Sequence, residues 1–255
     1  MPGSSRLTAG HHAGELALIG CAALAWYLTF LGLSDMSTGP GTMGLRLWGF
    51  LAVWTLMMAA MMLPALAPLT SMYLRSIRAV RSSRVRAIRT TALVGGYLLT
   101  WIGFGVVAYA AAALSALLAE NAADIAPWVG AGVLVAAGAY QLTLLKDFCL
   151  RHCRSPIAFL LHVSGYKGRL RDVRVGMYHG VYCVGCCWGL MLVLIAVGVM
   201  NLAWMAVLTV VIFLEKTWKY GPAFSRITGV SLIVFALFVP AHPELLPGLY
   251  MPAPM

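Results

Sequence analysis

Five of the six cysteines lie in two tight groups, Cys149 with Cys153, and Cys183 with Cys186 and Cys187. The spacing within each group places its thiols on one face of a helix. Thiolates are soft ligands that select Cu(I), Zn(II) or iron–sulfur clusters. If the two helices pack side by side, we expect the two groups to close one metal site or one redox centre.

Nearby residues could support such a site. Histidine supplies nitrogen ligands, and His152 and His179 lie close in sequence. Basic side chains stabilise thiolates, and four of them flank the cysteines: Lys146, Arg151, Arg154 and Lys216.

Methionines at helical spacing add a second soft ligand type. Thioethers suit Cu(I), so Met58, Met62 and Met191 are candidate transit or auxiliary ligands. Glu215 ends an apolar stretch, where an ionisable residue indicates function. It could act as a hard ligand, a proton acceptor or the partner of Lys216.

Two other interpretations remain open. Cys183-x-x-Cys186 has the spacing of a redox pair, as in a membrane thiol–disulfide oxidoreductase. Free cysteines also pack as small hydrophobes, which would fit a structural or assembly subunit. The sequence contains no nucleotide-binding, Ser/His/Asp or paired-carboxylate motif, and this favours a binding protein over an enzyme.

The composition indicates what positions these residues. The chain of 255 residues is 61% hydrophobic and 10% charged, whereas soluble domains carry about 25% charged residues. We therefore expect an all-α, polytopic transmembrane helix bundle. The apolar runs predict seven spans, at about residues 16–34, 47–69, 92–118, 127–146, 181–200, 202–218 and 223–240.

The basic residues predict the orientation. In this map every Lys and Arg except Arg46 falls on the side of the N-terminus, which the positive-inside rule makes cytoplasmic. Residues 1–15 are then a cytoplasmic tail, 16–240 one transmembrane domain, and 241–255 a Pro-rich extracytoplasmic tail. The net charge of +10 predicts anionic lipid headgroups as the partner, and not nucleic acid.

Several blocks between Trp48 and Lys219 resemble a bacterial family described as predicted metal-binding integral membrane proteins. The blocks are Trp54-x-x-Met57-Met58-x-x-Met61-Met62-x-Pro64, Gln141-x4-Lys146-x2-Cys149-x3-Cys153-Arg154, Cys183-x2-Cys186-Cys187-Trp188-x2-Met191, Gly198-x-Met200-Asn201-x2-Trp204-Met205 and Glu215-Lys216. The resemblance implies a multi-spanning inner-membrane protein with a metal site.

The sequence therefore predicts a protein that binds a soft metal, Cu(I) ahead of zinc or an iron–sulfur cluster. It would act in metal transport or in delivery to a client metalloprotein or metallochaperone. The predicted ligands are Cys149, Cys153, Cys183, Cys186, Cys187, Met58, Met62, Met191 and Glu215.

Overall fold

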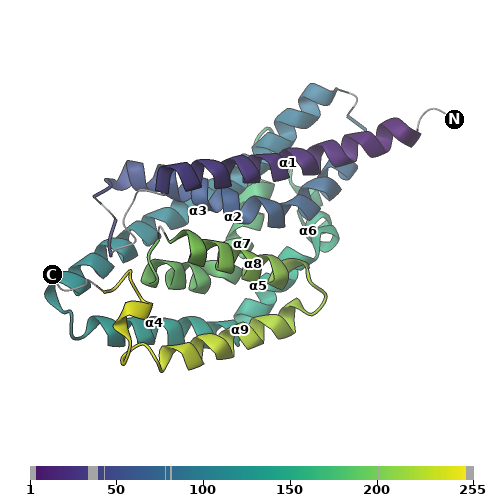
Figure 1. Cartoon of the computed structure of the whole chain (residues 1–255). Helices are drawn as coiled ribbons and strands as arrows, with labels where there is room; N and C mark the ends of the chain where they lie inside the picture. Colours follow the sequence, from purple (N-terminus) through teal and green to yellow (C-terminus); the bar gives the residue numbers. More distant parts are fainter. Residues whose placement is uncertain are drawn as a thin grey trace.

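The computed structural model describes residues 4–33, 40–42, 44–77, 79–80, 82–199 and 201–250, with side chains for all of these but 4–15 and 33. These residues form helices and no strand, as predicted (Figure 1). The α-helices are α1 Ser4–Leu33, α2 Leu47–Ser76, α3 Ser83–Asn121, α4 Ala126–Gln141, α5 Leu144–Arg154, α6 Pro156–His162, α7 Arg171–Ala196, α8 Leu202–Thr217 and α9 Gly221–Ala236. Two short 3-10 helices follow α6 and α9, η1 at Val163–Gly165 and η2 at Pro243–Leu245.

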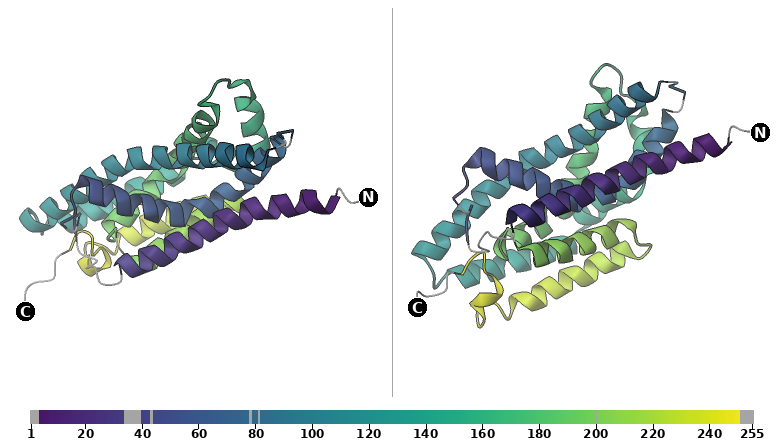
Figure 2. Two further views of the ribbon diagram at one scale, coloured as in Figure 1. Left: turned by 90° about the horizontal axis from the view of Figure 1, so that it is seen from above. Right: turned by 45° about the horizontal axis from the view of Figure 1, so that its top comes forward.

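The helices pack as neighbouring pairs in one bundle. α1 runs along α2, α3 along α7, and α4 along α9 (Figures 1 and 2). The apolar windows of α2 and α7 are 56% and 67% buried, against 28% for α3. The two helices that carry most of the candidate ligands therefore lie at the centre of the bundle.

Glycines let α3 and α7 approach closely. A Cβ added at Gly96 of α3 would overlap the backbone carbonyl of Val173, and one at Gly176 of α7 would overlap that of Leu93. Small residues at these positions let two helix backbones lie against each other. This contact fixes α7, and with it the thiols, against α3.

A matched pair of substitutions tests this contact. We expect Gly96→Ala to lower the free energy of unfolding by about 1–3 kcal/mol, because the added methyl group overpacks the interface. Gly95→Ala is the control, since nothing lies within 4 Å of a Cβ there. Unfolding in detergent measures both variants, and equal stability of the two would contradict the close approach.

An ion pair joins three helices at one end of the bundle. Arg89 of α3 lies 2.9 Å from the carboxylate of Asp172, at the start of α7. The hydroxyl of Tyr73, from α2, donates to the same carboxylate. These contacts fix the first turn of α7 relative to α2 and α3.

Three of the described helices are long and apolar enough to cross a membrane: α2, α3 and α7. α4 and α5 together would make a fourth, bent by 62° at its break. A span needs about 20 residues, whereas α8 and α9 have 16 each. Within the part of α1 that the structure describes with side chains, Leu16–Gly32 is an apolar helix. The helices are compatible with a membrane protein, but they do not confirm seven spans or the side of the N-terminus.

The helix boundaries correct where the thiols lie. Cys149 and Cys153 do not extend the helix predicted at 127–146, because α4 ends at Gln141 and α5 begins after a break. The Thr143 hydroxyl accepts a hydrogen bond from the Lys146 amide at 3.2 Å, so it caps the new helix. α7 begins at Arg171, and Cys183 lies 12 residues further on, about 18 Å along the axis. The second cysteine group is therefore midway along α7.

Candidate metal centre

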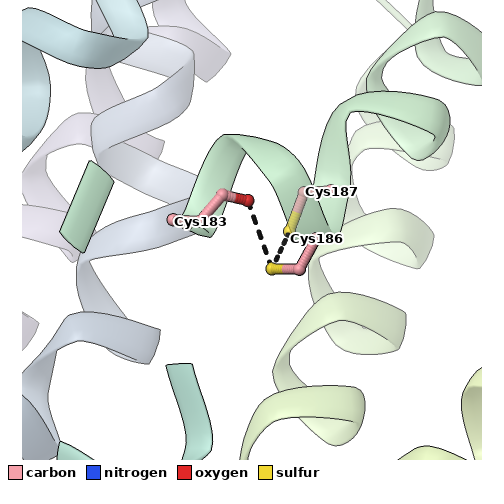
Figure 3. A group of neighbouring side chains, drawn as sticks. All are labelled: Cys183, Cys186 and Cys187. Atoms are coloured by element: carbon pink, nitrogen blue, oxygen red, sulfur yellow. Dashed lines mark hydrogen bonds between the residues drawn. The ribbon is translucent and has the colours of Figure 1, made fainter. Parts of the chain in front are cut away.

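Three cysteines of α7 form a compact group of sulfurs. The Sγ atoms of Cys183, Cys186 and Cys187 all lie within 4.8 Å of one another, and each residue is only 1% exposed. The Cys186 and Cys187 sulfurs are 3.3 Å apart, and the Cys186 thiol donates to the Cys183 carbonyl at 3.2 Å (Figure 3). We call these three residues the thiol triad.

α5 brings a fourth sulfur to the triad. The Sγ atoms of Cys153 and Cys186 are 3.8 Å apart. With metal–sulfur bonds of about 2.3 Å, two thiolates of one tetrahedral ion also lie about 3.8 Å apart. The half-buried Cys153 is therefore close enough to share an ion with the triad.

Cys149 does not join this group, although it lies one turn before Cys153 on the same helix. Its sulfur packs against α7 at Gly185, where an added Cβ would come within 2.8 Å of it. The last cysteine, Cys21, is exposed on α1. All six cysteines are free thiols.

Two polar groups converge on the Cys183 sulfur. Lys216 Nζ, from α8, lies 2.8 Å away and donates to it. The hydroxyl of Tyr97, from α3, lies 2.9 Å away. The buried ammonium compensates the negative charge of a thiolate, which is the form of cysteine that binds metals. The triad is thus equipped to carry negative charge in the core of the bundle.

Glu215 has a different partner from the one its sequence suggests. It pairs with Lys146 of α5 at 2.7 Å, and Gln141 donates to its other oxygen at 2.9 Å. The prediction of a pair with Lys216 is wrong, because adjacent residues point about 100° apart around a helix. Lys146 also donates to the Cys186 carbonyl, so the Lys146–Glu215 ion pair also contacts the backbone of the triad.

The predicted methionine ligands are all fully buried: Met58 and Met62 on α2, and Met191 on α7. The Met62 sulfur lies 3.9 Å from Lys216 Nζ, which places it beside the Lys216–Cys183 contact. Met191 follows Cys187 by one turn of α7. Three more methionines that could be soft ligands, Met36, Met43 and Met200, lie outside the described residues.

The two candidate histidines differ in their surroundings. His152 is partly exposed and stacks on Tyr182, with ring centroids 4.2 Å apart. His179 lies one turn before Cys183 and is buried, and its Nδ1 has no hydrogen-bond partner among the described residues. Its ring lies 6.0 Å from that of Tyr97. His179 is therefore the better placed nitrogen ligand.

Tyr97 was missed by sequence reasoning. It lies 86 residues before Cys183, and a tyrosine within an apolar helix carries no signal of its own. Only the packing of α3 on α7 brings its hydroxyl to the thiol.

The comparison with protein families supports copper as the metal of the thiol triad. The model of the family PpoB2, described as copper chaperone, matches residues 51–239. The chain belongs to the PpoB2 copper chaperone family. The matched region includes the thiol triad, Cys153, Lys146 and Lys216. No curated protein and no solved structure matches the chain.

Membership of the PpoB2 family agrees with the sequence analysis at a coarse level. The expectation of a metal-binding family is confirmed by the family match and by the thiol triad. The same two findings support copper binding.

Proposed function

We propose that this protein is an integral membrane copper chaperone that holds Cu(I) on the thiol triad. One observation carries the proposal: three buried sulfurs lie within 4.8 Å of one another in a chain of a copper chaperone family. Soft thiolates select Cu(I) over hard cations. Copper is here the cargo, which the protein binds and hands on to a client metalloprotein.

The surroundings of the triad suit a monovalent soft ion. The Lys216 ammonium offsets part of the thiolate charge. The uncharged hydroxyl of Tyr97 lies within hydrogen-bond distance of the same sulfur. Buried side chains around a metal site limit the access of water and tune the metal. The Met62 sulfur lies 3.9 Å from Lys216 Nζ, and Met62 is the auxiliary thioether ligand that we favour. Met58 and Met191, which are also buried, are further candidates.

The arrangement of the helices supports a membrane location. The connections between α2 and α3, between α5 and α7, and between α8 and α9 lie at the same end of the bundle as the start of α1 (Figure 1). These connections and the helix ends beside them carry most of the basic residues, including Arg84, Arg169 and Lys219. Such an asymmetry favours a cytoplasmic face that contacts anionic lipid.

The predicted topology is part of the proposal. Residues 1–15 would face the cytoplasm, 16–240 would form one transmembrane domain with up to seven spans, and 241–255 would lie outside a bacterial plasma membrane. The long helices α2, α3 and α7 support three of these spans.

Metal analysis of the purified protein tests the copper site. We expect about one Cu(I) per chain after anaerobic loading, with only sulfur ligands in the X-ray absorption spectrum, as for thiolate-bound Cu(I). Cys21→Ser, which changes an exposed thiol outside the triad, should behave identically. Protein that binds only zinc, or that carries a Cys183–Cys186 disulfide and no metal, would contradict the proposal, and the disulfide would support the oxidoreductase alternative.

A further inference from the structure

A chaperone must load and release its cargo, but the thiol triad is closed to solvent. Each of its residues is 1% exposed. An incoming ligand cannot reach a copper ion there without an intermediate position. The structure must therefore contain a group that links the triad to the surface.

Cys153 has the position that this step requires. It is half-buried, and its sulfur is 3.8 Å from that of Cys186, the separation of two thiolates that share one ion. Among the described cysteines of α5 and α7 it alone is half-buried, since Cys149 is 9% exposed and each triad residue 1%. It also comes from α5, whereas the three triad cysteines lie on α7.

Two cations fix α5 in place. At its start, Lys146 pairs with Glu215 and donates to the Cys186 carbonyl. At its end, Arg154 donates to the Glu215 carbonyl at 2.6 Å and to that of Lys219 at 3.3 Å. Both ends of α5 are thus joined to α7 or α8, and the Cys153 thiol is held over the triad.

We propose that Cys153 is the exchange ligand through which Cu(I) enters and leaves the thiol triad, an inference that rests on the proposed function. In release, a Cu–S bond to the Cys153 thiolate forms as the bond to Cys186 breaks. An incoming thiolate then binds the ion at the surface, the remaining triad bonds break, and the Cu–S bond to Cys153 breaks last as the ion leaves on the incoming thiolate. Copper stays Cu(I) throughout, and water takes up the proton of each thiol that binds and returns one to each thiolate that is freed.

The acceptor is defined by its chemistry. It is a partner that presents at least one accessible thiolate, because a soft thiolate is the ligand type that Cu(I) prefers. The same path in reverse loads the site from a thiol-bound copper donor.

The kinetics of the Cys153→Ser variant test this role. Protein loaded with one Cu(I) is mixed anaerobically with bathocuproine disulfonate, and transfer is followed by absorbance. We expect transfer to slow about tenfold or more, because the barrier rises when the intermediate loses a sulfur bond. The equilibrium affinity should stay within about threefold, since the triad is intact.

Two further variants separate this role from general damage. Cys149→Ser changes a buried thiol one turn earlier on α5 and should transfer copper at the wild-type rate. Cys153→Met keeps a soft sulfur and should restore part of the rate. If Cys153→Ser is less stable than Cys149→Ser, the comparison of Cys153→Met with wild type decides.

The outcomes distinguish the inference from the proposed function. A wild-type transfer rate in Cys153→Ser would overturn the exchange role and leave the copper site intact. A loss of equilibrium affinity as large as that of a triad variant would make Cys153 a permanent ligand, which also overturns it. If the wild-type protein does not bind Cu(I), the proposed function fails first.

Discussion

The Cys183→Ser/Cys187→Ser variant is expected to lose tight Cu(I) binding, with an affinity lower by more than about 100-fold. Outer partners of a metal ligand already account for about 10- to 100-fold, and this variant removes two ligands of the proposed site. A serine hydroxyl is a hard ligand that Cu(I) does not favour. Competition with a Cu(I) chelator under anaerobic conditions measures the change.

The control for this variant is a thiol outside the triad. Cys21→Ser should keep the wild-type affinity, because Cys21 is exposed on α1. Cys149→Ser should also keep it, since the Cys149 sulfur packs against Gly185. An unchanged copper stoichiometry and affinity in the double variant would rule out the thiol triad as the binding site.

The second large effect is expected at the buried ion pair between Lys146 and Glu215. Lys146 and Glu215 are 0% and 1% exposed and lie 2.7 Å apart. We expect Glu215→Gln to lower the free energy of unfolding by about 3–5 kcal/mol, because it leaves a buried ammonium without a counter-charge. Glutamine keeps the size of the side chain, so the loss reports the charge. Chemical unfolding in detergent measures it.

A double variant and a surface pair complete this experiment. Lys146→Met/Glu215→Gln removes both charges and should recover most of the loss, because a neutral replacement of a buried pair is often tolerated. The control is Arg226→Ala, which breaks a pair with Asp147 in which the Arg226 side chain is 65% exposed. Its effect should be about 0–1 kcal/mol. Equal effects of Glu215→Gln and Arg226→Ala would show that the buried pair is not needed for stability.

The arrangement within one helix could be predicted from the sequence. Cys183, Cys186 and Cys187 share a face wherever the chain is helical, because three and four residues complete about one turn. The apolar composition likewise predicted an all-α protein, since lipid requires every backbone group to be satisfied within the helix. The thiol triad followed from these local rules.

The contacts between helices were decided only by the tertiary structure. The break between α4 and α5, bent by 62°, sets the direction in which the two cysteines of α5 meet α7. As a result Cys153 reaches Cys186 and Cys149 reaches Gly185. From their spacing in the sequence alone, Cys149 and Cys153 would be equally good candidates for a contact with the triad.

The same holds for the charged and polar partners of the site. The sequence determined that Glu215 and Lys216 are neighbours at the end of a helix, and that an apolar chain carries soft ligands at helical spacing. It did not determine that Glu215 pairs with Lys146, or that Lys216 and Tyr97 meet at Cys183. Those pairs depend on how far each helix is rotated and how closely α3, α5 and α8 pack on α7, which no local pattern encodes.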